Sequence, residues 1–249
     1  PMPRPTNPPR STNTPRPPTS TSAPKSTNTP RPTPTPTATI DADPTVYDNF
    51  NNPAFDGSFN QNQWEIWGPL PYEIVQRDGI VTVTHEGKLN EGTFLVLRKF
   101  KNVVLNTSTF FETKLKMEPT KNSGWVFLWI DFSYSTAKGI AACRINENND
   151  AFCEYVDFSS RWDSRYETEY KPVGDGQFHK FRIDVDPITM TFTYYLDGQI
   201  FGSYMPTDAD KFKNRVSFTP SIGVANWTWN STAAIVGYFD DVRTGPVVQ

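Results

Sequence analysis

The feature that most constrains this chain is the alternation of apolar and polar residues over short stretches. In HKFRIDV, residues 179–185, the side chains of Phe181, Ile183 and Val185 share one side of an extended chain, and charged residues occupy the other. Similar stretches recur between breaks rich in Gly, Pro, Asn and Asp, and no window holds the 3.6-residue period of a long helix. This spacing predicts an all-β protein, a two-sheet antiparallel jelly-roll sandwich.

Two local features add to this prediction. The stretch TFTYYLDGQIFGSY, residues 191–204, predicts a hairpin, because Asp197 and Gly198 supply the positive φ angles that a two-residue turn needs. One short helix is expected in TDADKFKNR, residues 207–215, with a capping residue at its start.

Residues 1–44 differ in kind from residues 45–249. The first segment is almost entirely Pro, Thr, Ser, Asn and Arg, has no aromatic residue, and repeats STNTPRP from Ser11 and from Ser26. It cannot bury enough apolar surface to offset the entropy of ordering, so we expect a disordered or polyproline-like linker or stalk that is open to O-glycosylation. The domain is expected at 45–249. The opening PMPRP is not a signal peptide, and we expect an upstream module.

Charge and hydropathy exclude two classes of function. The first 40 residues contribute +5 to a total formal charge of −3, so residues 41–249 carry −8. An acidic domain argues against nucleic acid as the main partner. We interpret the five tail cations as spaced solubilising charges. No apolar run approaches the ~20 residues that a membrane-spanning helix needs.

The two cysteines lie in one predicted hairpin. The stretch between Cys143 and Cys153 is polar and rich in turn residues, which would place the two side chains opposite each other at the spacing a disulfide requires. A disulfide would favour an extracytoplasmic setting, and two buried free thiols are the alternative. A zinc site is not expected, because His85 and His179 are the only histidines and neither lies near a CxxC motif.

Three stretches, in order, resemble the concanavalin A-like lectin/glucanase superfamily, and most closely its laminin-G-like bacterial members. They are DGQFHKFRIDVDPITMTFTYYLDGQIFGSY, SFTPSIGVANWTW and VGYFDDVRTG, preceded by YDNF near the start of the domain. The resemblance covers Tyr47 to Gly245. It implies a jelly-roll sandwich, but it does not fix a function, because the fold hosts lectins, glycosidases, adhesion modules and spacers.

The resemblance also raises the question of catalysis. The glucanases of this superfamily carry Glu, Asp and Glu on one face of a single strand. No stretch here matches ExDxxE or ExDxE: WIDFS offers Asp131 alone, and a regular strand would place Glu154 and Asp157 on opposite faces. Glu167 and Glu169 share a face, but without an apolar strand around them, which indicates solvated charges. We therefore expect no enzymatic activity.

Aromatic residues indicate a carbohydrate platform. In GWVFLWID the two tryptophans, Phe127 and Asp131 share one strand face, while the other face is apolar like a core. Indole rings stack on the apolar face of a pyranose, and acids and amides bind its hydroxyls. A role in the core is the alternative for each aromatic residue. The expected ligand-binding residues are Trp125, Trp129, Asp131, Arg144, Glu154, Trp162, Tyr166, Trp227 and Trp229, with Trp129 and Trp162 ranked highest.

Acids at the two ends of the domain suggest a metal. In similar sandwiches the first and last strands pair, and acids there help to bind a structural calcium, which prefers hard oxygen ligands. Asp48 in YDNF and Asp240 and Asp241 in FDDV match that pattern by position. The alternative is that Asp240 or Asp241 caps a turn or pairs with Arg243.

These observations lead to an ordered set of functional predictions. The first is a non-catalytic carbohydrate-binding or adhesion module of a secreted or cell-surface protein, with a polysaccharide or surface glycan as partner. The second is a structural or protein-interaction module with a glycosylated stalk. The third is a glycoside hydrolase of the concanavalin A-like fold.

Overall fold

The computed structural model describes residues 45–88, 91–118, 124–134, 137–157, 163–174, 176–206, 216–226 and 233–247. The chain divides into two units, Pro1–Pro36 and Thr37–Gln249, and all the described residues belong to the second. The predicted linker at 1–44 and the predicted helix at 207–215 lie outside the described residues.

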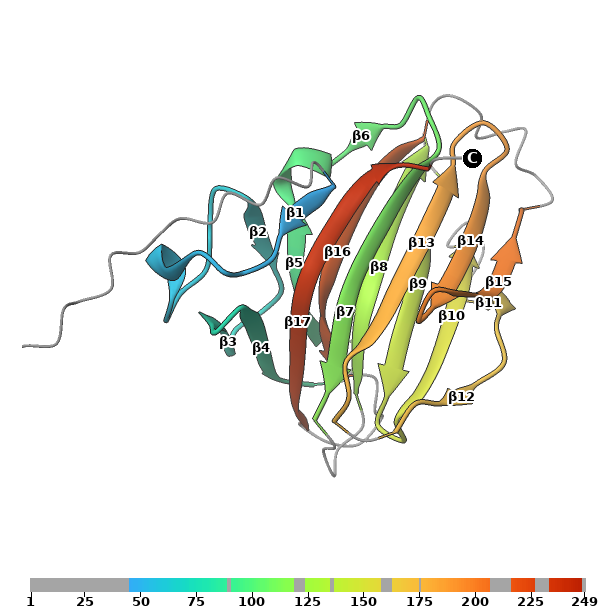
Figure 1. Cartoon of the computed structure of the whole chain (residues 1–249). Helices are drawn as coiled ribbons and strands as arrows, with labels where there is room; N and C mark the ends of the chain where they lie inside the picture. Colours follow the sequence, from blue (N-terminus) through green and yellow to red (C-terminus); the bar gives the residue numbers. More distant parts are fainter. Residues whose placement is uncertain are drawn as a thin grey trace, which may run out of the picture. The chain divides into compact units, whose positions relative to one another are not determined.

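The described residues form two antiparallel sheets, as predicted (Figure 1). The first, called sheet A, has eight strands, and the last strand of the chain lies in its interior. Its order is β15 (Gln199–Tyr204), β14 (Thr191–Leu196), β13 (His179–Asp186), β7 (Thr109–Met117), β17 (Ala233–Pro246), β4 (Ile80–Gly87) and β3 (Tyr72–Arg77), with β1 (Val46–Asp48) paired to β17.

The second sheet, called sheet B, has nine strands. Its order is β11 (Asp163–Glu167), β10 (Asp150–Asp157), β9 (Ala137–Asn146), β8 (Trp125–Tyr134), β16 (Ser217–Asn226), β5 (Glu91–Leu97) and β2 (Trp64–Trp67), with β12 (Lys171–Pro172) on β10 and β6 (Val103–Val104) on β16. The helices of the described part are two short 3₁₀ turns, η1 (Pro53–Phe55) and η2 (Arg98–Phe100). No helix within these residues has the length and apolar character that crossing a membrane requires.

The main core lies between the two sheets. Because successive strand residues point to opposite faces, each strand contributes every second side chain to it. Phe181, Ile183 and Val185 of β13 are fully buried, which confirms the predicted inward face. From sheet B, Val126 and Leu128 of β8 enter the same core. The alternation in the sequence therefore sets which face of each sheet is covered.

Two predicted hairpins are confirmed. The turn between β14 and β15 has Asp197 at φ +51° and Gly198 at φ +80°, as a two-residue turn with two positive φ angles requires. Strands β9 and β10 pair with Cys143 directly opposite Cys153, and the two residues form a disulfide buried in the main core. Of the two alternatives from the sequence, the structure shows the disulfide.

Candidate functional site

The face of sheet B turned away from sheet A, here called the outer face of sheet B, carries a second apolar cluster. On β8, Trp125, Phe127 and Trp129 point to this side, as predicted from their alternation. Phe127 and Trp129 are buried, whereas Trp125 is half-buried. The predicted shared face of this strand is therefore confirmed, and its role in ligand binding stays a prediction.

Small residues on β16 allow large rings from the two neighbouring strands to meet above β16. Ser221 pairs with Trp129 and Gly223 pairs with Phe127. A Cβ at Gly223 would lie 2.2 Å from the carbonyl oxygen of Thr93, so only glycine fits there. The ring centroids of Phe94 and Phe127 are 5.0 Å apart, and those of Phe94 and Trp129 are 5.6 Å apart. The rings form an aromatic platform that spans β5 and β8.

A trough of about 490 Å³ lies beside this platform. Sequence reasoning missed Trp67, Phe94 and Glu91 in its wall. A signal for Trp67 existed: in WEIW the alternation that buries Trp64 sends Trp67 to the other face. The sequences of β2 and β5 do not show which strands lie next to them in the sheet. The lining residues are Trp67, Gly68, Pro69, Glu91, Gly92, Phe94, Trp129 and Asp131.

Two neighbours hold Trp67 in place at one side of the trough. Its indole Nε1 donates to Glu65 Oε1 at 2.8 Å. Lys101 Nζ lies 2.7 Å from the same carboxylate oxygen and 5.3 Å from the centroid of the Trp67 ring. The ring is therefore fixed by a hydrogen bond and a cation–π contact before any ligand arrives.

Asp131 is the half-buried carboxylate of the trough. Burial raises its pKa to about 6, while the indole of Trp129 and the charge of Lys138 act in the opposite direction. The Trp129 N–H is near this carboxylate but does not reach hydrogen-bonding geometry with it. Asp131 thus changes its protonation state close to neutral pH, where an unperturbed aspartate is fully ionised.

Two buried polar groups on β8 and β16 have no hydrogen-bond partner in the described part of the chain. Among the described residues, Trp129 Nε1 and Ser221 Oγ are buried and form no hydrogen bond. They sit on neighbouring strands in direct register. A buried polar group without a partner costs free energy, so these two groups lower the stability of this face.

Arg144 and Glu154 lie on the same face but under the rings. Their side chains are 2% and 7% exposed and form a direct ion pair. The Arg144 guanidinium carbon lies 3.9 Å from the ring centroid of Trp125 and 5.2 Å from that of Trp129. Burial lowers the pKa of Arg144 to about 9, against the charges of Glu167 and Tyr170. These two candidates support the platform from below.

The remaining aromatic candidates are not among the residues that the structure places at the trough. Tyr166 packs against the main core: its ring stacks on Tyr204 at 5.3 Å and on Tyr194 at 6.0 Å. Its prediction as a ligand residue is corrected, because β11 turns this side chain inward opposite Tyr155. Trp162, Trp227 and Trp229 lie outside the described residues.

A second cavity, of about 200 Å³, lies on the opposite side of the molecule. It is lined by Glu112, Lys180, Arg182, Tyr195 and Gly198. Its charges are already satisfied: Lys180 pairs with Glu112, and the Arg182 guanidinium pairs with the next acid along β13. The trough on sheet B is therefore the stronger candidate for a binding site.

The first and last strands pair, as expected, but the acids near them have other partners. Asp48 accepts hydrogen bonds from the Phe50 backbone N–H at 2.9 Å and from Trp64 Nε1 at 2.8 Å. Asp241 pairs with Arg243, which confirms the alternative role predicted for this residue.

These partners bear on the expected calcium. Each of the three carboxylates already faces a donor or a cation, whereas Ca²⁺ takes six to eight oxygen ligands. Within the described ranges, no group of three or more His, Cys, Asp or Glu residues is placed to hold a metal ion. As arranged, the acids do not fit the ion, and calcium binding stays a prediction for a direct metal measurement.

Comparison with known proteins gives matches in structure but not in sequence. No protein-family model matches the chain, and no curated protein matches it. One similar structure is described as an endo-acting O-glycanase of the human gut microbiota that initiates mucin breakdown. It has a TM-score of 0.59 and 14% identity, over 79% of this chain and 96% of that one.

Two further structures show the same likeness. A laminarinase from Flavobacterium sp. UMI-01 has a TM-score of 0.59 and 12% identity, over 79% of this chain and 97% of that one. The carbohydrate recognition domain of Emp46p, in a potassium-bound form, has a TM-score of 0.55 and 10% identity, over 79% and 96%. The fold is that of the concanavalin A-like jelly rolls.

One functional prediction is corrected by these matches. Glycanases, a carrageenase and glucanases stand among the most similar structures, and they contradict the expectation that the protein is not an enzyme. The absence of a single-strand ExDxxE pattern was too narrow a criterion, because a jelly-roll face can bring together carboxylates from different strands.

Proposed function

We propose that this protein binds a polysaccharide in the trough on the outer face of sheet B and acts on it as a glycoside hydrolase. One observation carries the proposal: a half-buried carboxylate, Asp131, lies in a trough beside a fixed aromatic platform. Neighbours of the same fold that are glycanases and glucanases support it by analogy.

Binding follows from the composition of the walls. The rings of Trp67, Phe94 and Trp129 offer apolar faces to a sugar ring. The carboxylates of Glu91 and Asp131 can accept hydrogen bonds from hydroxyl groups that project from the sugar edge. An apolar wall with a few fixed polar groups is typical of a small-molecule or saccharide site.

Asp131 is the proposed proton donor. A general acid works best when its pKa is near the working pH, and burial raises the pKa of this group to about 6. In glycoside hydrolysis such an acid protonates the oxygen of the leaving group.

Glu154 is the proposed second carboxylate, although its side chain lies under the rings in an ion pair with Arg144 and does not line the trough. It pairs in register with Ala142, which in turn pairs with Trp129, so it lies on the same face two strands away. At ~4.8 Å per strand, its Cα is about 10 Å from that of Trp129. Asp131 pairs with Ile140, two residues from Ala142 along β9, so the Cα atoms of Glu154 and Asp131 lie ~12 Å apart on the same face. Arg144 supplies the counter-charge.

The setting belongs to the same proposal. A disulfide between Cys143 and Cys153 is typical of oxidising compartments, which supports a secreted or cell-surface protein. The laminin-G-like subclass, the stalk and the upstream module stay predictions from the sequence.

The test is the release of reducing ends from a panel of β-glucans, carrageenan and mucin. We expect activity on at least one of these and a loss of about 100-fold or more in Asp131→Asn and in Glu154→Gln. Glu169→Gln, at an exposed carboxylate outside the trough, is the matched control and should retain the wild-type rate.

Binding is measured in parallel by affinity electrophoresis. Trp129→Ala should lose retention on the polysaccharide that the wild type binds. If no polysaccharide is cleaved or retained by the folded protein, the proposal fails and the protein-interaction alternative takes its place. If cleavage persists in Asp131→Asn, another residue is the acid.

A further inference from the structure

A bulge in β17 brings two acids to one side of sheet A. The pairing of β17 with β7 is regular up to Asp240 and resumes at Arg243, so Asp241 and Val242 stand opposite a single residue of β7. Asp241 adopts φ +54°. In a regular strand, Asp240 and Asp241 would point to opposite faces. The bulge places both carboxylates on the outer face and returns Val242 to the core.

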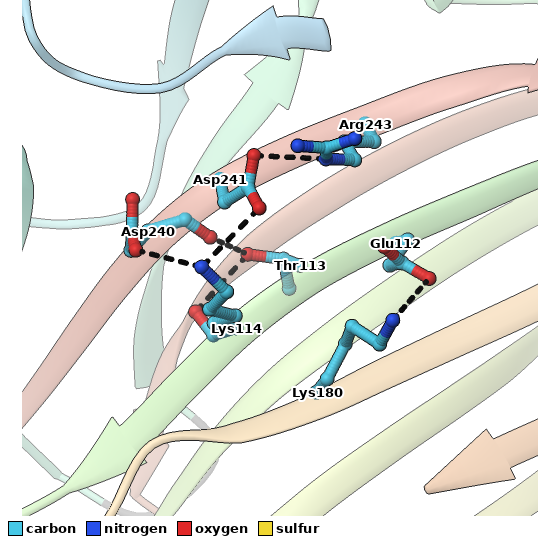
Figure 2. A network of polar contacts seen from close by, with 7 residues as sticks. All are labelled: Glu112, Thr113, Lys114, Lys180, Asp240, Asp241 and Arg243. Carbon is cyan, nitrogen blue, oxygen red and sulfur yellow. Dashed lines mark hydrogen bonds and ion pairs between the residues drawn. The ribbon is translucent and has the colours of Figure 1, made fainter. Parts of the chain in front are cut away.

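One lysine lies between the two carboxylates (Figure 2). Lys114 Nζ is 3.3 Å from Asp240 Oδ2 and 3.3 Å from Asp241 Oδ2. Arg243 Nε donates to the other oxygen of Asp241 at 2.9 Å. The buried Thr113 hydroxyl donates to the Asp240 carbonyl at 3.1 Å, which fixes the bulged backbone from the inside.

The charged form of Lys114 is stabilised in this position. Burial alone would lower the pKa of its amine, but the combined effect of Asp240 and Asp241 outweighs burial, and the pKa is raised. An ammonium group with three donors therefore sits where two carboxylates converge.

The position matters because three strands meet there. β1 pairs with β17 at Val46 opposite Arg243 and at Asp48 opposite Val242, directly beside the bulge. Lys114 and Arg243 together balance the charges of the two acids that the bulge exposes. Lys114 also holds β17 to β7 where the first strand of the domain is attached.

We propose that the Lys114 ammonium is the structural cation at the point where β1, β17 and β7 meet. It occupies the place between Asp240 and Asp241 that a metal ion would take, so the first and last strands are joined without bound metal. On this proposal, Lys114 explains why the three acids, as arranged, do not fit a calcium ion.

Thermal unfolding of the full chain, purified without added metal, tests this proposal. The wild type should contain no stoichiometric metal by elemental analysis, and millimolar EDTA should shift its Tm by less than about 1 °C. Lys114→Met should lower Tm by roughly 2–6 °C, because two carboxylates then face each other with one cation fewer. Millimolar Ca²⁺ should restore part of that loss in the variant and leave the wild type unchanged.

Lys180→Met is the matched control. Lys180 is a neighbouring lysine with a single partner, Glu112, at 3.7 Å, and it does not bridge two acids (Figure 2). It should lower Tm by less than about 2 °C and show no response to calcium.

Three results would overturn the proposal. One is stoichiometric calcium in the wild type together with a large loss of Tm in EDTA, a measurement that does not depend on any variant folding. Another is a Lys114→Met protein that melts like Lys180→Met. The third is a destabilised Lys114→Met protein that ignores calcium, which would reduce Lys114 to an ordinary ion-pair partner.

Discussion

At the scale of single residues, the outer face of sheet B is less stable than it would be if built for packing alone. Asp131 is partly buried with a raised pKa, and Trp129 Nε1 and Ser221 Oγ, both in the part of the chain that the structure describes, have no hydrogen-bond partner. Arg144 and Glu154 bury opposite charges under aromatic rings, and desolvation offsets most of the attraction between them. Such costs concentrate at functional sites.

The pKa of Asp131 predicts a pH-dependent effect of its replacement. The folded-state pKa of about 6 lies above the ordinary value of 3.8, so the stability that protonation provides is complete below pH 3.8 and is lost as pH rises through 6. Asp131→Asn should therefore unfold at a higher temperature than the wild type at pH 8. The expected gain is on the order of 2 kcal/mol, or roughly 4–8 °C.

The two proteins should melt alike near pH 3.5, where both are uncharged at this position. Melting curves across that pH range measure the difference directly. An equal difference at both pH values would mean that the amide acts through packing and not through charge.

At the scale of elements, the aromatic platform depends on the backbone of β16. Gly223 lies where a Cβ would approach the Thr93 carbonyl oxygen to 2.2 Å, and that oxygen belongs to the backbone of the adjacent strand. The two strands would have to separate to admit a methyl group. Phe94 and Phe127, which meet over Gly223, would then lose their contact.

Gly223→Ala is therefore expected to destabilise the domain and to weaken binding together. The expected cost is about 1–3 kcal/mol, as for other overpacked sites, or roughly 2–12 °C in Tm. Ala225→Gly on the same strand is the control, since it removes a methyl group and forces no strand apart. Retention of full polysaccharide binding by Gly223→Ala would show that the platform tolerates the shift.

Much of this element-level structure could be predicted from the sequence. Period-2 alternation identified the strands, the inward faces of β8 and β13, and the shared face of Trp125, Trp129 and Asp131, because side-chain direction in a strand follows from spacing alone. Strand neighbours could not be predicted in the same way. Trp67 and Phe94 reach the trough only because β5 lies beside β16 in the sheet and β2 lies beside β5.

Two further features depend on local geometry that the sequence does not show. Tyr166 belongs to an edge strand whose register with β10 shifts, and its polar surroundings gave no sign that its ring packs against the core. The bulge at Asp241 reversed the direction of one acid, and no sequence spacing announces a bulge. The partners of Asp48, Asp240 and Asp241 therefore became visible only in three dimensions.

At the scale of the whole molecule, the described residues begin at Thr45, where the Pro/Thr-rich composition has ended. The domain boundary predicted at 44/45 can be tested by a variant comprising residues 45–249. We expect its Tm to lie within about 2 °C of that of the full chain, since the removed segment has too little apolar surface to stabilise a core. Calorimetry of both proteins checks this. A much lower Tm would show that part of the segment packs on the domain.

The order of strands in the two sheets has a consequence for how the protein is made. β17 lies between β7 and β4 in sheet A, and β16 lies between β8 and β5 in sheet B. Each sheet therefore has one of the last two strands of the sequence in its interior. During synthesis, the strands that will flank them emerge first and have no neighbour to pair with across the gap. Sheet B cannot close until residue 226 has left the ribosome, and sheet A cannot close until residue 246 has done so. A nascent chain of this fold therefore has unpaired strand edges through nearly all of its translation, and such edges can pair with other chains unless chaperones cover them.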